Sequence, residues 1–156
     1  MHNSVRFSLA AALVLVAGAA FMSAQSPPTA VTVIPGSETR AAFEKGRPLI
    51  ETSTYKVHAS RREGPGQAEW HGLDTDIFYV VEGTATIVTG GQLTEAKDTA
   101  SNERRGAGIA GGASRSVAKG DVIIIPAGTV HQFTVVSSPF LYYTVKVTDM
   151  RSPKQP

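Results

Sequence analysis

From residue 30 onwards the chain is a succession of short runs, rich in β-branched and aromatic residues, separated by Gly, Pro and Asp. Alternation of apolar and polar positions with a period of two is typical of strands. Helical spacing is hard to find beyond Ala41–Lys45, where one helical turn is expected. Many short strands with regular turn signals predict an all-β sandwich or barrel. The expected strands are Val31–Ile34, Leu49–His58, Gln67–His71, Asp76–Val81, Thr84–Thr89, Arg115–Ala118, Val122–Ile125, His131–Val136 and Phe140–Val147.

The first residues follow a different pattern. A weakly positive start, Met1–Arg6, precedes an uninterrupted apolar run, Phe7–Phe21, and small residues follow at Ser23–Ala24. This is the layout of a secretory signal peptide, and the run is shorter than the roughly 20 residues that a membrane span needs. We therefore expect residues 1–24 to be removed, leaving a periplasmic or secreted protein with no stable membrane span. A retained N-terminal helix is the alternative.

The rest of the chain divides by composition. Residues 25–48 are expected to form a lead-in and an edge strand, beginning with the Pro-rich and disordered Gln25–Ala30. Residues 49–150 carry the regular strand pattern and are expected to form one barrel, followed by a tail at 151–156. One segment, Gly90–Gly112, is polar and Gly-rich, and a long loop or an irregular hairpin is expected there.

The amino-acid composition excludes several kinds of binding partner and catalytic group. A chain of 156 residues fits one domain with a single core. Its 15 Lys and Arg residues nearly balance its 13 Asp and Glu residues, and this balance gives no electrostatic case for binding nucleic acid or an anionic membrane. The chain has no cysteine, which excludes disulfides, cysteine nucleophiles and thiolate metal ligands.

Two segments, Glu69–Gly83 and Gly120–His131, carry candidate chemistry. Alternate side chains of a strand share a face, so Glu69 and His71 are expected to point the same way. Asp76 opens the next strand and can return its carboxylate to the same place. The second segment predicts a strand, a tight Pro/Gly turn and then a histidine at the head of another strand.

The two segments resemble the paired motifs of the cupin superfamily. The second segment matches G-x5-P-x-G-x2-H at every fixed position, although the customary Asn four residues later is Val135. The first motif, G-x5-H-x-H-x3,4-E-x6-G, is matched less well, since Glu69 holds the first His position and Asp76 the Glu position. Gly64 holds the leading Gly position of this motif, but one residue too few separates it from Glu69. The resemblance covers roughly Tyr55 to Val147 and implies a single-domain double-stranded β-helix, or jelly-roll barrel. Its matching residues are Gly83, Gly120, Pro126, Gly128, His71 and His131.

The resemblance also implies a metal site. Carried over by position, the ligands are Glu69, His71, Asp76 and His131, a set of nitrogen and oxygen donors that suits Fe, Mn, Zn or Ni as a divalent ion. Glu69 is alternatively a general base. Tyr79 is the second candidate catalytic residue, because Phe78 and Tyr79 alternate and one of them must face the barrel interior. The competing interpretation is that the two acids are solvated strand-edge charges and that His131 is hydrogen-bonded beside a turn.

Other polar residues carry weaker expectations. His58, on the strand before the first motif, is expected to be partly exposed and not a ligand. Phe133 has the parity of His131 and should face the same cavity. Arg104 and Arg105 are interpreted as a solvated loop tip in preference to a clamp for a carboxylate or phosphate. One of the adjacent residues Tyr142 and Tyr143 should point inwards, where packing is the commoner role.

Three functions remain open at this point. The first is a metal-dependent enzyme acting on a small oxygenated organic molecule, with dioxygenase-like chemistry slightly favoured by the set of two histidines and one carboxylate. The second is a non-catalytic binder of a metal or small ligand in the cell envelope. The third is a metal-free structural barrel. A homodimer is expected, because pairing would bury the N-terminal edges Val31–Ile34 and Leu49–Ser53.

Overall fold

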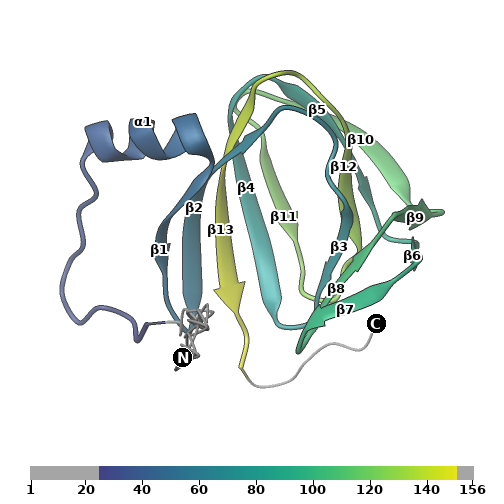
Figure 1. Cartoon of the computed structure of the whole chain (residues 1–156), viewed down its shortest axis with the longest axis horizontal. Helices are drawn as coiled ribbons and strands as arrows, with labels where there is room; N and C mark the ends of the chain where they lie inside the picture. The colour runs from purple at the N-terminus through teal and green to yellow at the C-terminus, as the bar shows by residue number, and fades with distance from the viewer. Residues whose placement is uncertain (1–24, 151–156) are drawn as a thin grey trace, which may run out of the picture.

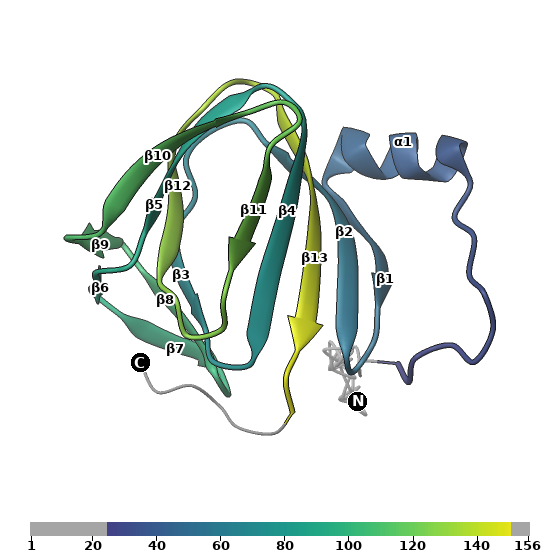
Figure 2. The ribbon, with the colours of Figure 1, turned by 180° about the vertical axis from the view of Figure 1, so that it is seen from behind.

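The computed structural model describes residues 25–150, so the expected signal peptide and tail lie outside the described residues. The described chain has one helix and forms two large antiparallel sheets that curve around a shared interior (Figures 1 and 2). The predicted all-β jelly-roll barrel is therefore confirmed. No helix within residues 25–150 is long and apolar enough to cross a membrane.

The first sheet has the strand order β1-β2-β13-β4-β11 and the second has the order β10-β5-β12-β3-β8-β7. A third, two-stranded sheet pairs β6 with β9 and lies at the end of the molecule away from the helix (Figure 1). The helix is α1 (Gly36–Lys45), and the strands are β1 (Arg47–Glu51), β2 (Tyr55–Arg62), β3 (Ala68–His71), β4 (Asp74–Glu82), β5 (Thr84–Thr89), β6 (Gln92–Thr94), β7 (Lys97–Ala100), β8 (Glu103–Gly106), β9 (Gly108–Ala110), β10 (Ala113–Ala118), β11 (Val122–Ile125), β12 (His131–Val136) and β13 (Phe140–Thr148).

Most of the predicted strands are present. The strands β5, β11 and β12 have the predicted bounds, and β3, β4, β10 and β13 differ by one to two residues at an end. The strands β5 and β11 end next to Gly90 and Pro126, which stop a strand for local steric reasons.

The predictions fail in the N-terminal part. Val31–Ile34 is not a strand, and Val31 and Val33 are 92% and 80% exposed. The expected strand Leu49–His58 is two strands, because the Thr52 hydroxyl donates to the Tyr55 carbonyl (2.7 Å) and closes a turn between β1 and β2.

The helix is longer than the single turn expected. It spans Gly36–Lys45, with Glu38 in its first turn and Lys45 in its last, as the helix dipole favours. It ends at Gly46, whose positive φ of 62° lets its N–H reach the carbonyl of Ala42. The helix lies beside β1 and β2 (Figure 1), where it packs Phe43 on Tyr143, with ring centroids 5.0 Å apart.

The core lies between the two sheets and combines aromatic and aliphatic side chains. Phe78, Phe133, Phe140 and Tyr142 form one cluster with ring centroids 5.0 to 5.6 Å apart. Phe133 faces the interior from the same side of β12 as His131, as predicted. The buried aliphatic residues that complete the cluster are Val80, Ala85, Ile87, Val117 and Ile125.

Shortening the Ile87 side chain should destabilise the protein, because Ile87 is 1% exposed and packs among the other buried residues of the core. Ile87→Val is expected to lower the free energy of unfolding by about 1 kcal/mol. Urea unfolding followed by circular dichroism measures it. Ile124→Val removes the same methylene from a side chain that is 64% exposed and should have almost no effect. Equal losses in the two variants would contradict this account of the core.

The segment Gly90–Gly112 is more ordered than a loop. It holds the strands β6 to β9, and β8 pairs with β3 so that Glu103 lies opposite His71 and Arg105 opposite Glu69. The antiparallel pairs β6/β9 and β7/β8 correspond to the irregular hairpin that was one of the two expectations for this segment. The separate strands were not predicted, because their residues are polar and Gly-rich. The strands β8 and β7 extend the second sheet beyond β3, and β8 adds the charged side chains of Glu103 and Arg105 to the barrel interior.

Candidate metal centre

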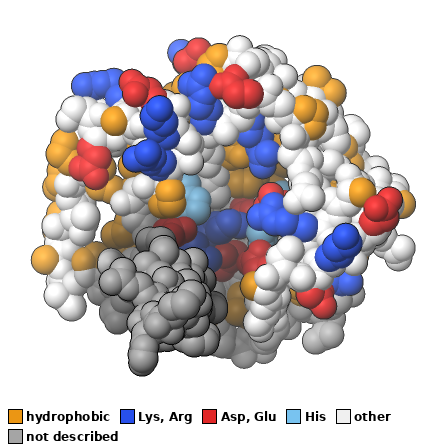
Figure 3. Space-filling model, viewed as in Figure 1, with side chains coloured by type: hydrophobic (Ala, Val, Ile, Leu, Met, Phe, Trp, Pro, Cys, Tyr) orange, Lys and Arg blue, Asp and Glu red, His pale blue; other side chains and the backbone are white. Residues whose placement is uncertain are grey.

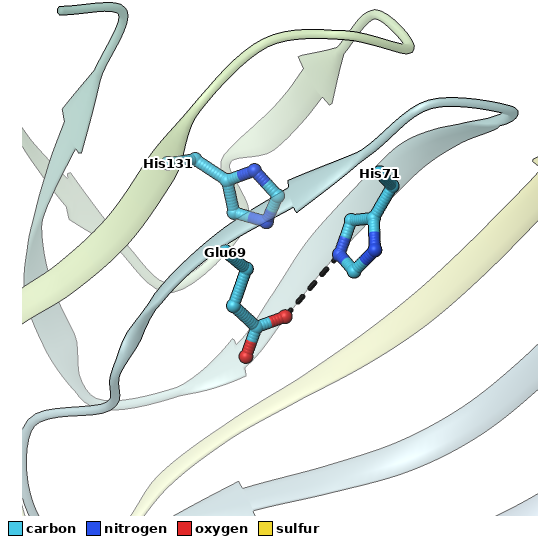
Figure 4. Close-up of side chains that lie close together, drawn as sticks. All are labelled: Glu69, His71 and His131. Carbon is cyan, nitrogen blue, oxygen red and sulfur yellow. Dashed lines mark ion pairs between the residues drawn. The ribbon is translucent and has the colours of Figure 1, made fainter. Parts of the chain in front are cut away.

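Three donor side chains meet where β3 and β12 lie side by side. Glu69 and His71 share one face of β3, while Trp70 points to the other face and donates its indole N–H to the Gly128 carbonyl (3.0 Å). In the β12–β3 pairing, His131 lies directly opposite Glu69. Figure 4 shows the three side chains, Glu69, His71 and His131, turned toward one another.

The turn before β12 holds this arrangement in place. Gly128 has a φ of 83°, which favours glycine, and its N–H donates to the His71 carbonyl (2.7 Å). The fixed Pro and Gly of the second motif thus attach β12 to the end of β3. This contact is the physical reason why His131 comes close to His71, with ring centroids 5.3 Å apart.

The donor atoms are spaced as a small cation requires. One ligand atom each from Glu69, His71 and His131 lies within 4.8 Å of the other two. His71 Nε2 is buried and lacks a hydrogen-bond partner among residues 25–150, although Glu69 Oε2 is 3.2 Å away. His131 Nδ1 lies 3.1 Å from the Thr129 carbonyl, which leaves Nε2 available. A divalent ion fits this set of two imidazoles and one carboxylate.

Asp76, the fourth predicted ligand, lies beside the cluster. Its Oδ2 is 3.4 Å from His131 Nε2 and 3.6 Å from His71 Nε2. Its Oδ1 forms an ion pair with Lys146 Nζ at 2.7 Å. The four predicted ligands are therefore neighbours, but Asp76 is shared between the histidines and a lysine. Lys146 was not predicted, and it reaches Asp76 because β13 pairs with β4 in a register that places the two residues opposite each other.

Glu103 also supports the centre. Its carboxylate accepts a short hydrogen bond from His71 Nδ1. A carboxylate on the far nitrogen of a ligating histidine fixes the tautomer and directs the other nitrogen to the metal. Nothing in the sequence singled out Glu103, since its only signal was a place in the long polar segment.

The charges in the cluster stabilise one another. Burial raises the pKa of Glu69, but the contacts with His71 and Arg105 outweigh burial and hold this pKa well below its ordinary value. Burial lowers the pKa of His71, yet the carboxylates of Glu103 and Glu69 outweigh it and raise this pKa to about 9. The pKa of Asp76 is lowered against burial by His131 and Lys146. Metal uptake must therefore displace a proton from His71.

Two expectations need correction. Tyr79 is 46% exposed on the outer face of β4, because alternation turns Phe78 and Asp76 inwards and Tyr79 outwards. It does not reach the cluster, so its prediction as a catalytic residue is wrong. Arg105 is not a solvated loop residue, since its Nη1 lies 2.6 Å from Glu69 Oε1. Arg104 lies on the other face of β8, with Nε 3.0 Å from Asp98.

The cluster lies in a cavity of about 290 Å³ inside the barrel. Figure 3 shows the hollow in one face of the molecule, with acidic, basic and histidine side chains gathered in it. His58 lines it too, is partly exposed as expected, and contacts Glu51 (2.8 Å). The charged residues in the lining are the acids Glu51, Glu69, Asp74, Asp76 and Glu103. The bases are Lys56, Arg62, Arg105 and Lys146.

The raised pKa of His71 makes the stability of the metal-free protein depend on pH. The folded pKa, about 9, lies above the unfolded value near 6.5, so this stabilisation is complete below pH 6.5 and is lost as pH rises to 9. With a chelator present, the free energy of unfolding should fall over this range by at most about 1.4 kcal/mol per pH unit. Urea titrations at several pH values measure it. Glu103→Gln should flatten the dependence, and an unchanged slope in that variant would contradict the assignment.

Comparison with known proteins supports the fold. The sequence matches no family model and no curated protein. Among solved structures, the Bacillus halodurans protein BH2720 superposes with a TM-score of 0.56 at 18% identity, over 85% of this chain and 92% of that one. A cupin-2 domain protein from Shewanella frigidimarina superposes with a TM-score of 0.50 at 18% identity, over 74% of this chain and 94% of that one.

A third structure, the protein NMB1881 from Neisseria meningitidis, gives a TM-score of 0.50 at 15% identity, over 75% of this chain and all of that one. Identities this low report on the fold alone. The order of the strands, the two motifs and the likeness to a solved cupin-2 domain agree, and this chain therefore has the cupin fold.

Proposed function

We propose that this protein is a metal-dependent enzyme that acts on a small oxygenated organic molecule held in the barrel cavity. The observation that carries the proposal is the meeting of Glu69, His71 and His131 in a cavity of about 290 Å³, with His71 Nε2 buried and lacking a hydrogen-bond partner among residues 25–150. In the metal-free protein the Glu69 carboxylate, 3.2 Å away, balances the charge on His71, and a cation bound among the three donors would take the place of that proton.

Each side chain has a role in the proposed site. His71 and His131 offer their Nε2 atoms as ligands, and Glu69 adds a carboxylate oxygen. Divalent ions supply Lewis-acid chemistry in such a site, and iron or manganese also supplies reactivity with dioxygen. Asp76 faces the cavity beside both imidazoles, so its carboxylate can add a fourth oxygen donor, as the cupin resemblance implies. Lys146 holds Asp76 in that position.

Dioxygenase-like chemistry is the preferred form of the proposal, because two histidines and one carboxylate are the ligand set of many non-haem iron oxygenases. The test is oxygen consumption by the iron-loaded protein with a panel of small hydroxy acids, phenols and sugar derivatives, beside the zinc-loaded protein. Iron-dependent uptake with at least one compound, lost in His131→Ala, would support it. A metal-loaded protein that binds compounds and turns none over would favour the non-catalytic envelope binder.

We also propose that the protein works outside the cytoplasm, in the periplasm or the medium. The support is the apolar run Phe7–Phe21, which follows Arg6 and precedes the small residues Ser23 and Ala24. N-terminal sequencing of protein recovered from a host cell fraction tests the proposal. A start near Gln25 in the exported fraction is expected, and an intact Met1 in the cytoplasm would contradict it.

A homodimer remains part of the proposal. Its support is the position of β1 at the edge of the first sheet, together with the exposed side chains of Val31 and Val33 nearby in sequence. Light scattering on the purified protein tests it. A monomer mass at high concentration would contradict the dimer and leave the metal site unaffected.

A further inference from the structure

We propose that the cavity takes a small organic acid whose carboxylate binds Arg62 while a second oxygen of the same molecule reaches the metal. This inference rests on the proposed metal site and names the class of ligand for it. The argument depends on how Arg62 is held, on which cavity charges are already paired, and on where Arg62 lies relative to the cluster.

Arg62 is held rigidly at the cavity wall. It ends β2, its side chain is 24% exposed, and its Nε donates to the phenol oxygen of Tyr142 at 2.8 Å. Its guanidinium carbon lies 5.4 Å from the centre of the Phe133 ring and 6.0 Å from that of Tyr142. A cation stacked on two rings loses little entropy on binding a ligand, so this guanidinium is pre-organised.

The backbone at Gly66 contributes to the same arrangement. A Cβ atom built at Gly66 would lie 2.2 Å from Arg62 Nη1, so any larger residue there would push the guanidinium away. Gly66 is fixed in turn, because its N–H donates to the Phe133 carbonyl (3.1 Å) and its own carbonyl accepts from Gln132 (2.9 Å). The position of Arg62 is therefore defined by two rings, a phenol and a neighbouring main chain.

Arg62 differs from the other three bases in the cavity. Lys56 lies 3.1 Å from Asp74 Oδ2, Lys146 lies 2.7 Å from Asp76, and Arg105 lies 2.6 Å from Glu69. These three are each paired with one acid.

The nearest carboxylate oxygen to Arg62 is Glu69 Oε1, at 4.0 Å, beyond hydrogen-bond range. Within residues 25–150, Arg62 is thus the cavity lysine or arginine with no carboxylate in hydrogen-bond range. Its Nη groups are the donors that remain for an incoming anion, and a guanidinium fork matches a carboxylate in two parallel hydrogen bonds.

The distance to the metal cluster sets the ligand class. Glu69 connects the two places, since Oε1 is 4.0 Å from Arg62 Nη2 while Oε2 is 3.2 Å from His71 Nε2. A ligand that bridges them needs a carboxylate and a second oxygen only a few bonds apart, as in hydroxy acids and keto acids. Phe78 and Phe133 line the same cavity and can cover the carbon chain. A volume of about 290 Å³ leaves room for a small acid only.

Isothermal titration calorimetry tests the inference on the nickel-loaded protein, with lactate as the acid and lactamide as its uncharged counterpart. Lactate should bind the wild type, and Arg62→Gln should weaken it by about tenfold to a hundredfold, the usual range for one charge-assisted contact. Arg62→Lys keeps the positive charge but lacks the two parallel donors of a guanidinium. Its affinity for lactate should lie between those of the wild type and Arg62→Gln. Lactamide should bind weakly and equally to all three proteins.

Arg61→Gln is the matched control, because Arg61 directly precedes Arg62 in the same strand and pairs with the exposed Glu63. It should bind lactate as the wild type does. Metal content and thermal midpoint are measured for every protein, so a failed metal site or a misfolded variant is recognised separately. Folded, nickel-loaded Arg62→Gln that binds lactate like the wild type, or a loaded wild type that does not bind lactate, would overturn the inference. A wild type that takes up no nickel would instead overturn the metal site.

Discussion

The double variant His71→Ala/His131→Ala is expected to contain almost no metal. Two of the three donors in the cluster are then gone, and the remaining carboxylate of Glu69 is already held by Arg105 at 2.6 Å. A lone exposed or paired carboxylate binds transition metals weakly, whereas imidazole nitrogens provide most of the affinity in mixed sites. Metal content falling from near one ion per chain to below about a tenth is the expected result. Plasma mass spectrometry on protein purified without chelators measures it.

His58→Ala is the control for this experiment. His58 lines the same cavity but interacts with Glu51 and lies outside the cluster of donors. Its loss should leave the metal content unchanged, and His58 therefore separates a general effect of histidine removal from loss of the ligands. A wild type that stays empty when iron, manganese, nickel and zinc are each supplied would contradict the metal site and favour a structural barrel.

The second large effect is expected from Lys146→Met. Asp76 is 2% exposed and Lys146 provides the close cation on its Oδ1, at 2.7 Å. Removing one partner of a buried ion pair costs about 3 to 5 kcal/mol, and protonated His71, 3.6 Å from Oδ2, offsets part of this loss. The free energy of unfolding of the metal-free protein should fall by about 3 kcal/mol, measured by urea unfolding with a chelator present.

The control is the double variant Lys146→Met/Asp76→Asn, which removes both charges and should recover most of the lost stability. Metal should also restore stability to Lys146→Met, because the released Asp76 carboxylate then faces the two imidazoles with no competing lysine. If the single and double variants were equally unstable, the loss would reflect packing of the Lys146 stem and not the charge on Asp76.

Comparison of sequence and structure shows where local signals suffice. The strands β5, β11 and β12 were predicted with their bounds, and β5 and β11 consist mainly of β-branched residues that end next to Gly90 and Pro126. The same local rules placed Glu69 and His71 on one face of a strand and Trp70 on the other. They failed for Tyr79, since alternation states that Phe78 and Tyr79 point oppositely but not which of them points inwards.

The sequence by itself predicted an all-β chain, because alternation and turn residues act over a few neighbouring residues. Its resemblance to the two cupin motifs pointed to Glu69, His71, Asp76 and His131. The tertiary structure alone decided which charges join them. Glu103 and Arg105 enter through the pairing of β8 with β3, Lys146 through β13 with β4, and Arg62 through its contact with Tyr142. A period of two assigns a face to each side chain, but it does not identify the partner strand or its register. Packing and backbone hydrogen bonds between distant segments select those.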